Sequence, residues 1–162
     1  MKSAREPRRQ SKEQVLNRLA GLCSRSEQCS ADILVKLRRT TLTADEQSEI
    51  MDTLTAAGFV DDARYARSFA NDKVRFSGWG RRKISLHLAA KRISRELIDE
   101  ALAGIEADDY KEALIRTARA KARTLDVSDR EDRVKLLRHL ASRGFEPQLC
   151  IRVVEAIERR LP

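Results

Sequence analysis

The sequence predicts an all-α fold, an elongated, curved array of three tandem three-helix repeats. Of the 162 residues, 41% are hydrophobic, only 4% are aromatic and 36% are charged. This balance is typical of helices rich in Ala, Leu, Arg and Glu. Helix start and stop signals divide the chain into short segments, and apolar positions recur at a period of roughly 50 residues, as they do in helical repeat proteins.

The N-terminal segment and the first helix differ in periodicity. Residues 1–10 are basic and show no helical pattern, so we expect a flexible basic arm. The first repeat, 11–58, opens with a capping box formed by Ser11 and Gln14. In a capping box the two side chains satisfy backbone N–H groups that a helix start leaves unpaired. Apolar residues follow at helical spacing and predict a helix over about 12–24.

Two further helices complete the first repeat. Ser30 is expected to cap a short helix that ends near Thr40. Thr43 and Glu46 form a second capping box, which opens the third helix. Gly58 ends it, because glycine tolerates the left-handed conformation that closes the last turn of a helix.

The second repeat, 59–106, contains most of the aromatic residues. Asp61 and Asp62 open its first helix, which is predicted to run to about Phe76 and then break at a Gly-Trp-Gly turn. Two more helices follow, and Gly104 ends the last one. The residues expected to face inward are Tyr65, Ala66, Phe69, Ala70, Val74, Ile84, Leu88, Leu97, Ile98, Ala101 and Leu102.

The third repeat, 107–162, follows the same plan. Its first helix is predicted to begin near Asp108. Ser128 and Glu131 are expected to form a capping box for the second helix, which stops at Gly144. The residues expected to face inward are Ile115, Ala118, Ala122, Leu125, Val134, Leu137, Leu140, Cys150, Val153, Val154, Ile157 and Leu161.

The three repeats can be superposed on their apolar positions. The residues that coincide at offsets of 51 and 52 are Ile33, Ile84 and Leu136, and then Leu37, Leu88 and Leu140. Each repeat is too small to bury a core by itself, so neighbouring repeats must stack.

Charge is concentrated in blocks rather than spread evenly. The chain has a net charge of +8. Nine cations against three acids give residues 61–92 a charge of +6, whereas residues 93–110 have one cation and six acids, a charge of −5. This pattern favours a polyanionic partner, either nucleic acid or a protein that carries it. A helical protein with solvated charged faces explains the charge alone equally well.

Several functional classes find no support in the sequence. There is no phosphate-binding loop, nucleophile elbow or metalloprotease motif, so we expect no enzymatic activity, cofactor or metal. The cysteines Cys23, Cys29 and Cys150 form no CxxC pair and are expected to be reduced. No apolar run is long enough to span a bilayer, and no secretory signal is evident, so we expect a cytoplasmic protein without membrane contact.

The two histidines and the single tryptophan are candidates for functional roles. His87 and His139 lie one repeat apart, which favours separate structural roles over a shared site. Trp79 lies in a glycine-flanked turn beside three cations. It is expected either to anchor the interface between repeats or to meet a partner, and the sequence does not choose between these roles.

Several segments together form a recognisable family pattern. They are GFVDDARYARSF, the Gly-Trp-Gly turn, RRKISLHLAAKRIS, ELIDEAL, and RVKLLRHLASRGFEPQLCIRVV. In these segments the chain resembles the RecX family of bacterial regulators of the RecA recombinase. The resemblance covers residues from about 12 to 160 and implies three tandem three-helix repeats. One departure is Arg92, where the family commonly has glycine before isoleucine.

The resemblance implies a non-enzymatic protein that binds RecA filaments on DNA. Such a protein inhibits RecA ATPase, strand exchange and coprotease activity in recombination, DNA repair and the SOS response. Single-stranded or double-stranded DNA is an expected weaker partner, and a monomer is the expected state. The alternative is a helical-repeat DNA-binding or nucleoid protein that acts without RecA.

Helix phase and the basic block locate the expected partner surface in the second repeat. Trp79 is included because its turn adjoins the cations. The residues expected to bind the RecA filament or DNA are Arg64, Arg67, Lys73, Arg75, Trp79, Arg81, Arg82, Lys83 and Arg92.

Overall fold

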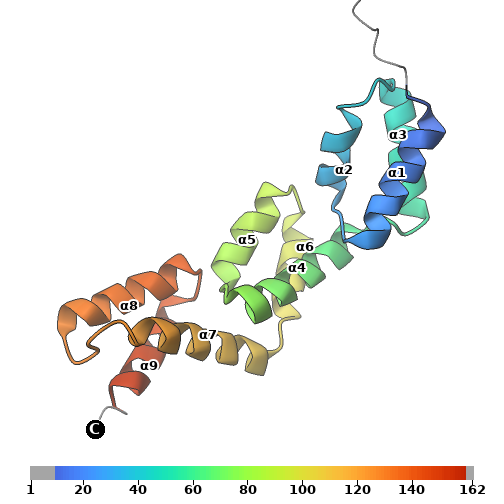
Figure 1. Cartoon of the computed structure of the whole chain (residues 1–162). Coiled ribbons are helices and arrows are strands. Elements are labelled where there is room, and N and C mark those ends of the chain that lie inside the picture. The colour runs from blue at the N-terminus through green and yellow to red at the C-terminus, as the bar shows by residue number, and fades with distance from the viewer. Residues whose placement is uncertain (1–9, 160–162) are drawn as a thin grey trace, which may run out of the picture. The chain divides into compact units, whose positions relative to one another are not determined.

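The computed structural model describes residues 10–159, and all nine elements in this range are α-helices. Figure 1 shows them in chain order. The expected N-terminal arm lies, apart from Gln10, outside the described residues. The helices are α1 (Lys12–Arg25), α2 (Ser30–Leu37), α3 (Ala44–Ala56), α4 (Asp62–Ser77), α5 (Arg81–Ala90), α6 (Arg95–Ala103), α7 (Ala107–Ala122), α8 (Arg130–Ser142) and α9 (Pro147–Glu158). The chain divides into two compact units, Met1–Tyr65 and Ala66–Pro162.

Both capping boxes predicted in the first repeat are present. The hydroxyl groups of Ser11 and Thr43 each accept a hydrogen bond from the backbone N–H of the third helical residue. The prediction for α2 was wrong by one residue, because Cys29 is the N-cap and Ser30 is already helical. The N–H of Ser30 donates instead to the carboxylate of Asp62, at 2.7 Å. An acid expected to serve only its own helix therefore caps a second one.

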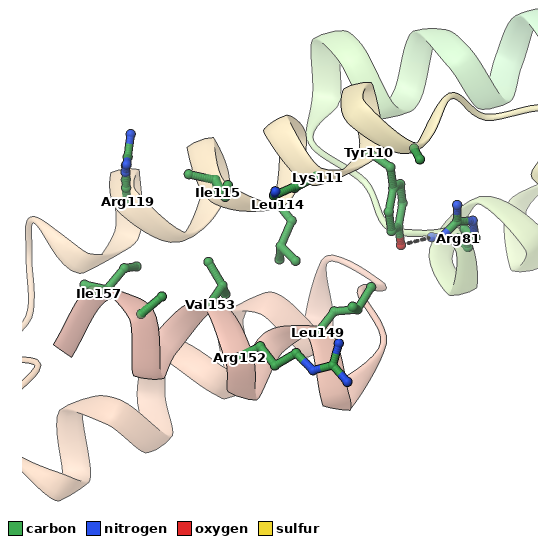
Figure 2. Close-up of a pocket in the computed structure, with 12 residues that line it drawn as sticks. Arg81, Tyr110, Lys111, Leu114, Ile115, Arg119, Leu149, Arg152, Val153 and Ile157 are labelled. Carbon is green, nitrogen blue, oxygen red and sulfur yellow. Dashed lines mark hydrogen bonds between the residues drawn. The ribbon is translucent and has the colours of Figure 1, made fainter. Parts of the chain in front are cut away.

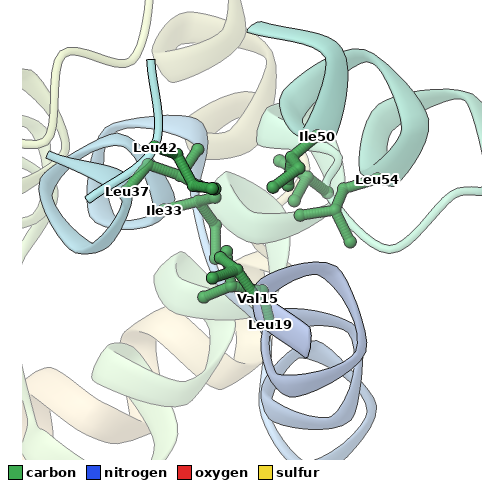
Figure 3. Close-up of a cluster of buried hydrophobic side chains, with 8 residues drawn as sticks. Val15, Leu19, Ile33, Leu37, Leu42, Ile50 and Leu54 are labelled. Atoms are coloured by element: carbon green, nitrogen blue, oxygen red, sulfur yellow. The ribbon is translucent and has the colours of Figure 1, made fainter. Parts of the chain in front are cut away.

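The first unit has a continuous apolar core, drawn in Figure 3. Side chains from α1, α2 and α3 meet there and are almost completely shielded from solvent. Phe59 and Cys23 pack against its edge. The buried members are Val15, Leu19, Ile33, Leu37, Leu42, Ile50, Leu54 and Val60.

The superposition of repeats correctly identified core positions. Ile33, Leu37, Ile84, Leu88, Leu136 and Leu140 all have 0% exposure. The tandem three-helix plan predicted from the sequence is confirmed by this equivalence and by the order of the helices.

Three helices end in the same left-handed turn. Gly58, Arg92 and Gly144 have φ of 75°, 58° and 92° and follow α3, α5 and α8. After each, the next residue donates its N–H to the carbonyl five residues earlier, as Phe59 does to the carbonyl of Leu54 at 2.9 Å. This is the Schellman closure, which favours glycine. Arg92 corresponds to Gly144 at the 52-residue offset, so it occupies a position built for glycine.

Some side chains lie on different faces from those predicted. Val134 of α8 was expected to face inward and is 38% exposed. In α7 the buried residues are Tyr110, Ala113, Leu114 and Ala118, so the core-facing stripe is rotated from the predicted one. Tyr110, near the start of α7, is buried although it was not among the residues expected to face inward. The structure therefore corrects the helix phase in the third repeat.

The predicted capping box of α8 was also wrong. The N-cap is Asp129, whose carboxylate accepts from the N–H of Asp132. Ser128 instead donates its N–H and hydroxyl to Asp126, at 3.0 and 2.6 Å. Ser128 and Asp129 are both able to cap this helix, and the residue immediately before the helix takes that role. Pro147 is at the first position of α9 as predicted.

Glycines allow the second and third repeats to meet backbone to backbone within the second unit. The N–H of Gly80 donates to the carbonyl of Arg143 at 2.8 Å, and the N–H of Arg82 donates to the carbonyl of Gly144 at 3.1 Å. A Cβ atom on Gly80 would lie 2.2 Å from the backbone of Gly144. One on Gly144 would lie 2.4 Å from the backbone nitrogen of Lys83. Neither glycine can be replaced without moving main chain.

Polar side chains complete this contact. The Tyr110 hydroxyl donates to Glu146 at 2.6 Å and accepts from the N–H of Arg81 at 3.0 Å. The guanidinium of Arg81 lies 3.9 Å from the centre of the Tyr110 ring and 3.3 Å from the Glu146 carboxylate. We call Gly80, Arg81, Tyr110, Gly144 and Glu146 the repeat joint.

Candidate partner interface

Aromatic and cationic side chains gather at the Gly-Trp-Gly turn, on α4 and α5. The Trp79 ring is 4.5 Å from the His87 ring and 6.2 Å from the Phe69 ring, between centroids. The ammonium groups of Lys73 and Lys83 lie 4.9 and 4.5 Å from the centroid of Trp79. We call Phe69, Lys73, Trp79, Lys83 and His87 the cation–aromatic cluster.

The turn itself holds Trp79 in place. Its N–H donates to the carbonyl of Lys73 at 3.0 Å. Gly78 precedes it with φ of 59°, and a Cβ atom there would lie 2.6 Å from the hydroxyl of Thr117. The ring is half-buried, and its contacts with the rings of Phe69 and His87 and with the ammonium groups of Lys73 and Lys83 lie within the second repeat. Of the two roles left open for Trp79, these contacts disfavour that of a joint between repeats.

Three of the predicted binding cations are already paired within the protein. Arg64 bonds to the Glu27 carboxylate at 2.7 Å and to the carbonyl of Gly58 at 2.9 Å. Arg75 donates twice to Asp109, at 2.6 and 2.9 Å. These carboxylates raise the pKa of both guanidinium groups through hydrogen bonding and charge. Arg64 and Arg75, like Arg81 in the repeat joint, therefore have a structural role within the protein.

The other predicted arginines are available to a partner. Arg67, Arg82 and Arg92 are exposed, and their side chains form no hydrogen bond or ion pair within residues 10–159. Arg82 and Lys83 lie in the first turn of α5, where the helix dipole disfavours positive charge. Its first backbone N–H groups are occupied by the repeat joint. With the N–H groups of Arg81 and Arg82 occupied, recognition of an anion here falls mainly to the side chains.

The described residues offer little for catalysis. Burial is the main cause that raises the pKa of Cys150 and of Cys23, which keeps both thiols protonated and poorly nucleophilic. Burial, assisted by Lys121 and Arg143, lowers the pKa of His139 and favours its neutral form. No group of acids, histidines and cysteines in residues 10–159 is arranged to hold a metal ion. Within the same range, no helix has the length and apolarity of a bilayer-spanning segment.

Comparison with known proteins identifies the family. Residues 61–102 match the model of the second three-helix domain of RecX, and residues 108–154 match that of the third. The chain belongs to the RecX family. It is 30% identical over 128 residues to "Regulatory protein RecX" from Mycobacterium ulcerans, covering 78% of this chain and 74% of that protein. It is 32% identical over 125 residues to the RecX of Chromohalobacter salexigens, covering 77% and 80%.

The fold is also that of a solved RecX structure. The crystal structure of RecX from Lactobacillus salivarius superposes with a TM-score of 0.80 at 21% identity, covering 91% of this chain and 97% of that one. The family assignment made from the sequence is thus confirmed, and the chain is a member of a family of regulatory proteins.

Sequence analysis did not identify the repeat joint. Gly80 and Gly144 were interpreted as turn residues, and Tyr110 was not assigned a role. The similarity between the Gly-Trp-Gly turn and the Arg-Gly-Phe turn was available as a signal. Both combine glycine with an aromatic residue at a helix end, which is a composition suited to close backbone contact.

Proposed function

We propose that this protein binds RecA filaments on DNA and restrains their ATP hydrolysis, strand exchange and coprotease activity. The observation that carries the proposal is the half-buried Trp79, whose ring centroid lies 4.9 and 4.5 Å from the ammonium groups of Lys73 and Lys83. Arg67, Arg82 and Arg92 add cations on the same repeat that have no structural partner among residues 10–159. Membership of the RecX family supports RecA as the partner.

The chemistry of the surface suits a structured anionic partner. Lysine ammonium groups that rest on an indole ring keep free donor positions for carboxylate or phosphate oxygens. The ring supplies apolar contact area that does not depend on sequence in a bound nucleic acid. Arg64, Arg75 and Arg81 are placed in a secondary role, because a partner would have to compete with their internal carboxylates.

The test is RecA ATPase activity on single-stranded DNA with increasing amounts of the protein. We expect inhibition at micromolar concentrations. The triple variant Lys73→Ala, Arg82→Ala, Lys83→Ala should need about tenfold more protein for the same effect. The matched control removes three exposed cations of the third repeat, Arg123, Arg130 and Arg138, and should inhibit like the wild type. Unchanged ATPase with the wild-type protein would overturn the proposal.

A second candidate function is DNA binding without RecA, which the exposed part of Trp79 and the two lysines beside its ring favour. Salt titration separates the two. Binding through phosphates alone weakens by about 0.7 logarithmic units per contacted phosphate and tenfold rise in salt on single strands. Tight salt-sensitive binding to bare DNA, combined with no effect on RecA, would favour this second function.

A further inference from the structure

An apolar groove runs between α7 and α9 in the third repeat, away from the cation–aromatic cluster. Its volume is about 470 Å³, and Figure 2 shows Leu114 of α7 and Val153 of α9 directed into it from opposite sides. Ile115 and Ile157 are only partly buried there. Two aliphatic helix faces therefore leave a channel that their own side chains do not fill.

Every charged residue that lines this groove is a cation. The lining includes Arg81, Lys111, Arg119 and Arg152 and, among the described residues, no acid. Arg81 is engaged in the repeat joint. Lys111, Arg119 and Arg152 are exposed and form no hydrogen bond or ion pair within residues 10–159. The groove thus combines an apolar floor with a rim of uncompensated positive charge.

The dimensions fit a short helix. From Ala107 to Arg119 the α7 wall spans about 18 Å at 1.5 Å per residue, or roughly three helical turns. An amphipathic helix of that length presents apolar side chains at positions i, i+4 and i+7 along one stripe. Acids on its flanks would reach the cations on both walls of the groove, Lys111 and Arg119 on α7 and Arg152 on α9.

We propose that the α7–α9 groove binds an acidic amphipathic helix of a partner protein. The basic residues 1–10 of this chain are an unsuitable occupant because their charge matches that of the rim. A second copy is also unsuitable. Its acidic helices α3 and α6 bury their apolar residues Ile50, Leu54, Ile98 and Ala101 in its own core.

This surface does not depend on the role proposed for the cation–aromatic cluster. The groove is lined by residues of the third repeat and by Arg81, and none of the cluster residues lines it. The two proposals can therefore fail separately, and the groove is tested without RecA and without DNA.

The probe is a synthetic, fluorescently labelled peptide of roughly 14 residues with leucine at i, i+4 and i+7 and glutamate on both flanks. Binding to the full chain is followed by fluorescence anisotropy. Two control peptides replace the glutamates by glutamine or the leucines by alanine. We expect the acidic, leucine-containing peptide to bind at least about tenfold more tightly than either control.

Two variants then place the site. The triple variant Lys111→Ala, Arg119→Ala, Arg152→Ala should weaken peptide binding by at least about tenfold and flatten its salt dependence. The variant Ile115→Ala, Ile157→Ala should weaken it with the salt dependence retained. The control lacking Arg123, Arg130 and Arg138 should bind normally. Circular dichroism should show helicity unchanged in all three.

Three results would overturn the inference. One is no peptide binding up to about 1 mM, which corresponds to a binding free energy weaker than about 4 kcal/mol. Another is equal binding of the glutamate and glutamine peptides. The third is a DNA oligonucleotide that binds in place of the peptide and is lost in the triple variant, which would make the groove a nucleic-acid site.

Discussion

Residues at the Gly-Trp-Gly turn are neighbours in sequence but belong to two different structural groups, the repeat joint and the cation–aromatic cluster. Gly80 and Arg81 enter the repeat joint, where backbone and side chains are fully committed to the third repeat. In the cation–aromatic cluster, Trp79 and Lys83 are only half-buried, and they keep exposed ring surface and ammonium N–H donors for a partner. A run of basic residues therefore cannot be treated as one surface, because its members separate according to the contacts that the fold gives them.

The largest effect should follow from filling the space inside the repeat joint. Gly144→Ala places a Cβ atom 2.4 Å from the nitrogen of Lys83, at a φ of 92°. We expect a loss of about 3 kcal/mol or more in the free energy of unfolding, measured by urea denaturation.

Gly58→Ala is the matched control for that variant. It has a similar φ of 75°, but nothing lies within 4 Å of the added Cβ atom. Only backbone strain remains, so the loss should be about 1 kcal/mol. Equal losses in the two variants would show that the close approach of the backbones contributes nothing.

Removing the hydroxyl of Tyr110 should have the next largest effect. Tyr110→Phe eliminates the hydrogen bonds to Glu146 and from Arg81 and leaves one oxygen of the part-buried Glu146 carboxylate without its donor. We expect a loss of about 2 kcal/mol at neutral pH. Denaturant titration with far-ultraviolet circular dichroism measures it.

The same residue makes stability depend on alkaline pH. Burial and the hydrogen bond to Glu146 raise the pKa of Tyr110 above its usual value of 10.0. A raised pKa means that the folded state keeps its proton more strongly, so this contribution is complete below pH 10 and declines as pH rises above it. The difference in stability between wild type and Tyr110→Phe should therefore shrink with rising alkaline pH. A constant difference would contradict the assignment.

Adjacent arginines provide a sharper test of the comparison. Arg81→Ala removes a guanidinium that stacks on Tyr110 and pairs with Glu146, so we expect a loss of about 1 to 2 kcal/mol in stability. Arg82→Ala should change stability by less than about 0.5 kcal/mol, since its side chain is exposed. Thermal unfolding of the two variants gives both values. The RecA ATPase assay should give the opposite order. Arg82→Ala should weaken inhibition more than Arg81→Ala does, although it costs less stability.

The smallest effect should be a gain. Arg92→Gly relieves a φ of 58° at a position whose counterpart is Gly144, while it gives the unfolded chain more freedom. We expect a net stabilisation of up to about 1 kcal/mol by urea denaturation. Weaker RecA inhibition by this more stable protein would indicate that the arginine is retained for binding. If Arg92→Gly were less stable than the wild type, the backbone at Arg92 would not be strained as proposed.

The sequence was sufficient for what depends on local pattern. The capping boxes at Ser11 and Thr43, the left-handed turn at Gly58 and the equivalent buried positions all follow from spacing within a few residues or from the repeat itself. Even the departure at Arg92 pointed to a real feature of the backbone. These inferences required no knowledge of what lies across the molecule.

The candidate site was less predictable because its decisive contacts are distant in sequence. Helix phase correctly placed Arg75 on the outer face, but its partner Asp109 is 34 residues away. Arg81 meets Glu146 at a separation of 65 residues. Val134 shows the opposite failure, since a residue in the predicted inward stripe of α8 is 38% exposed. The spacing of residues along a helix indicates the direction in which a side chain points, but it does not identify the residue that the side chain contacts.

Lys83 links the two sides of the turn in a single residue. Its backbone lies against Gly144, where there is no room for a Cβ atom, while its ammonium group rests over Trp79. A lysine on an ordinary surface loses rotamer entropy when it binds, about 0.5 to 1.5 kcal/mol for an immobilised side chain. Here much of that ordering has already occurred on folding. The cluster is therefore preorganised, and a partner that matches its spacing would be bound with a smaller entropic loss than its charge alone implies.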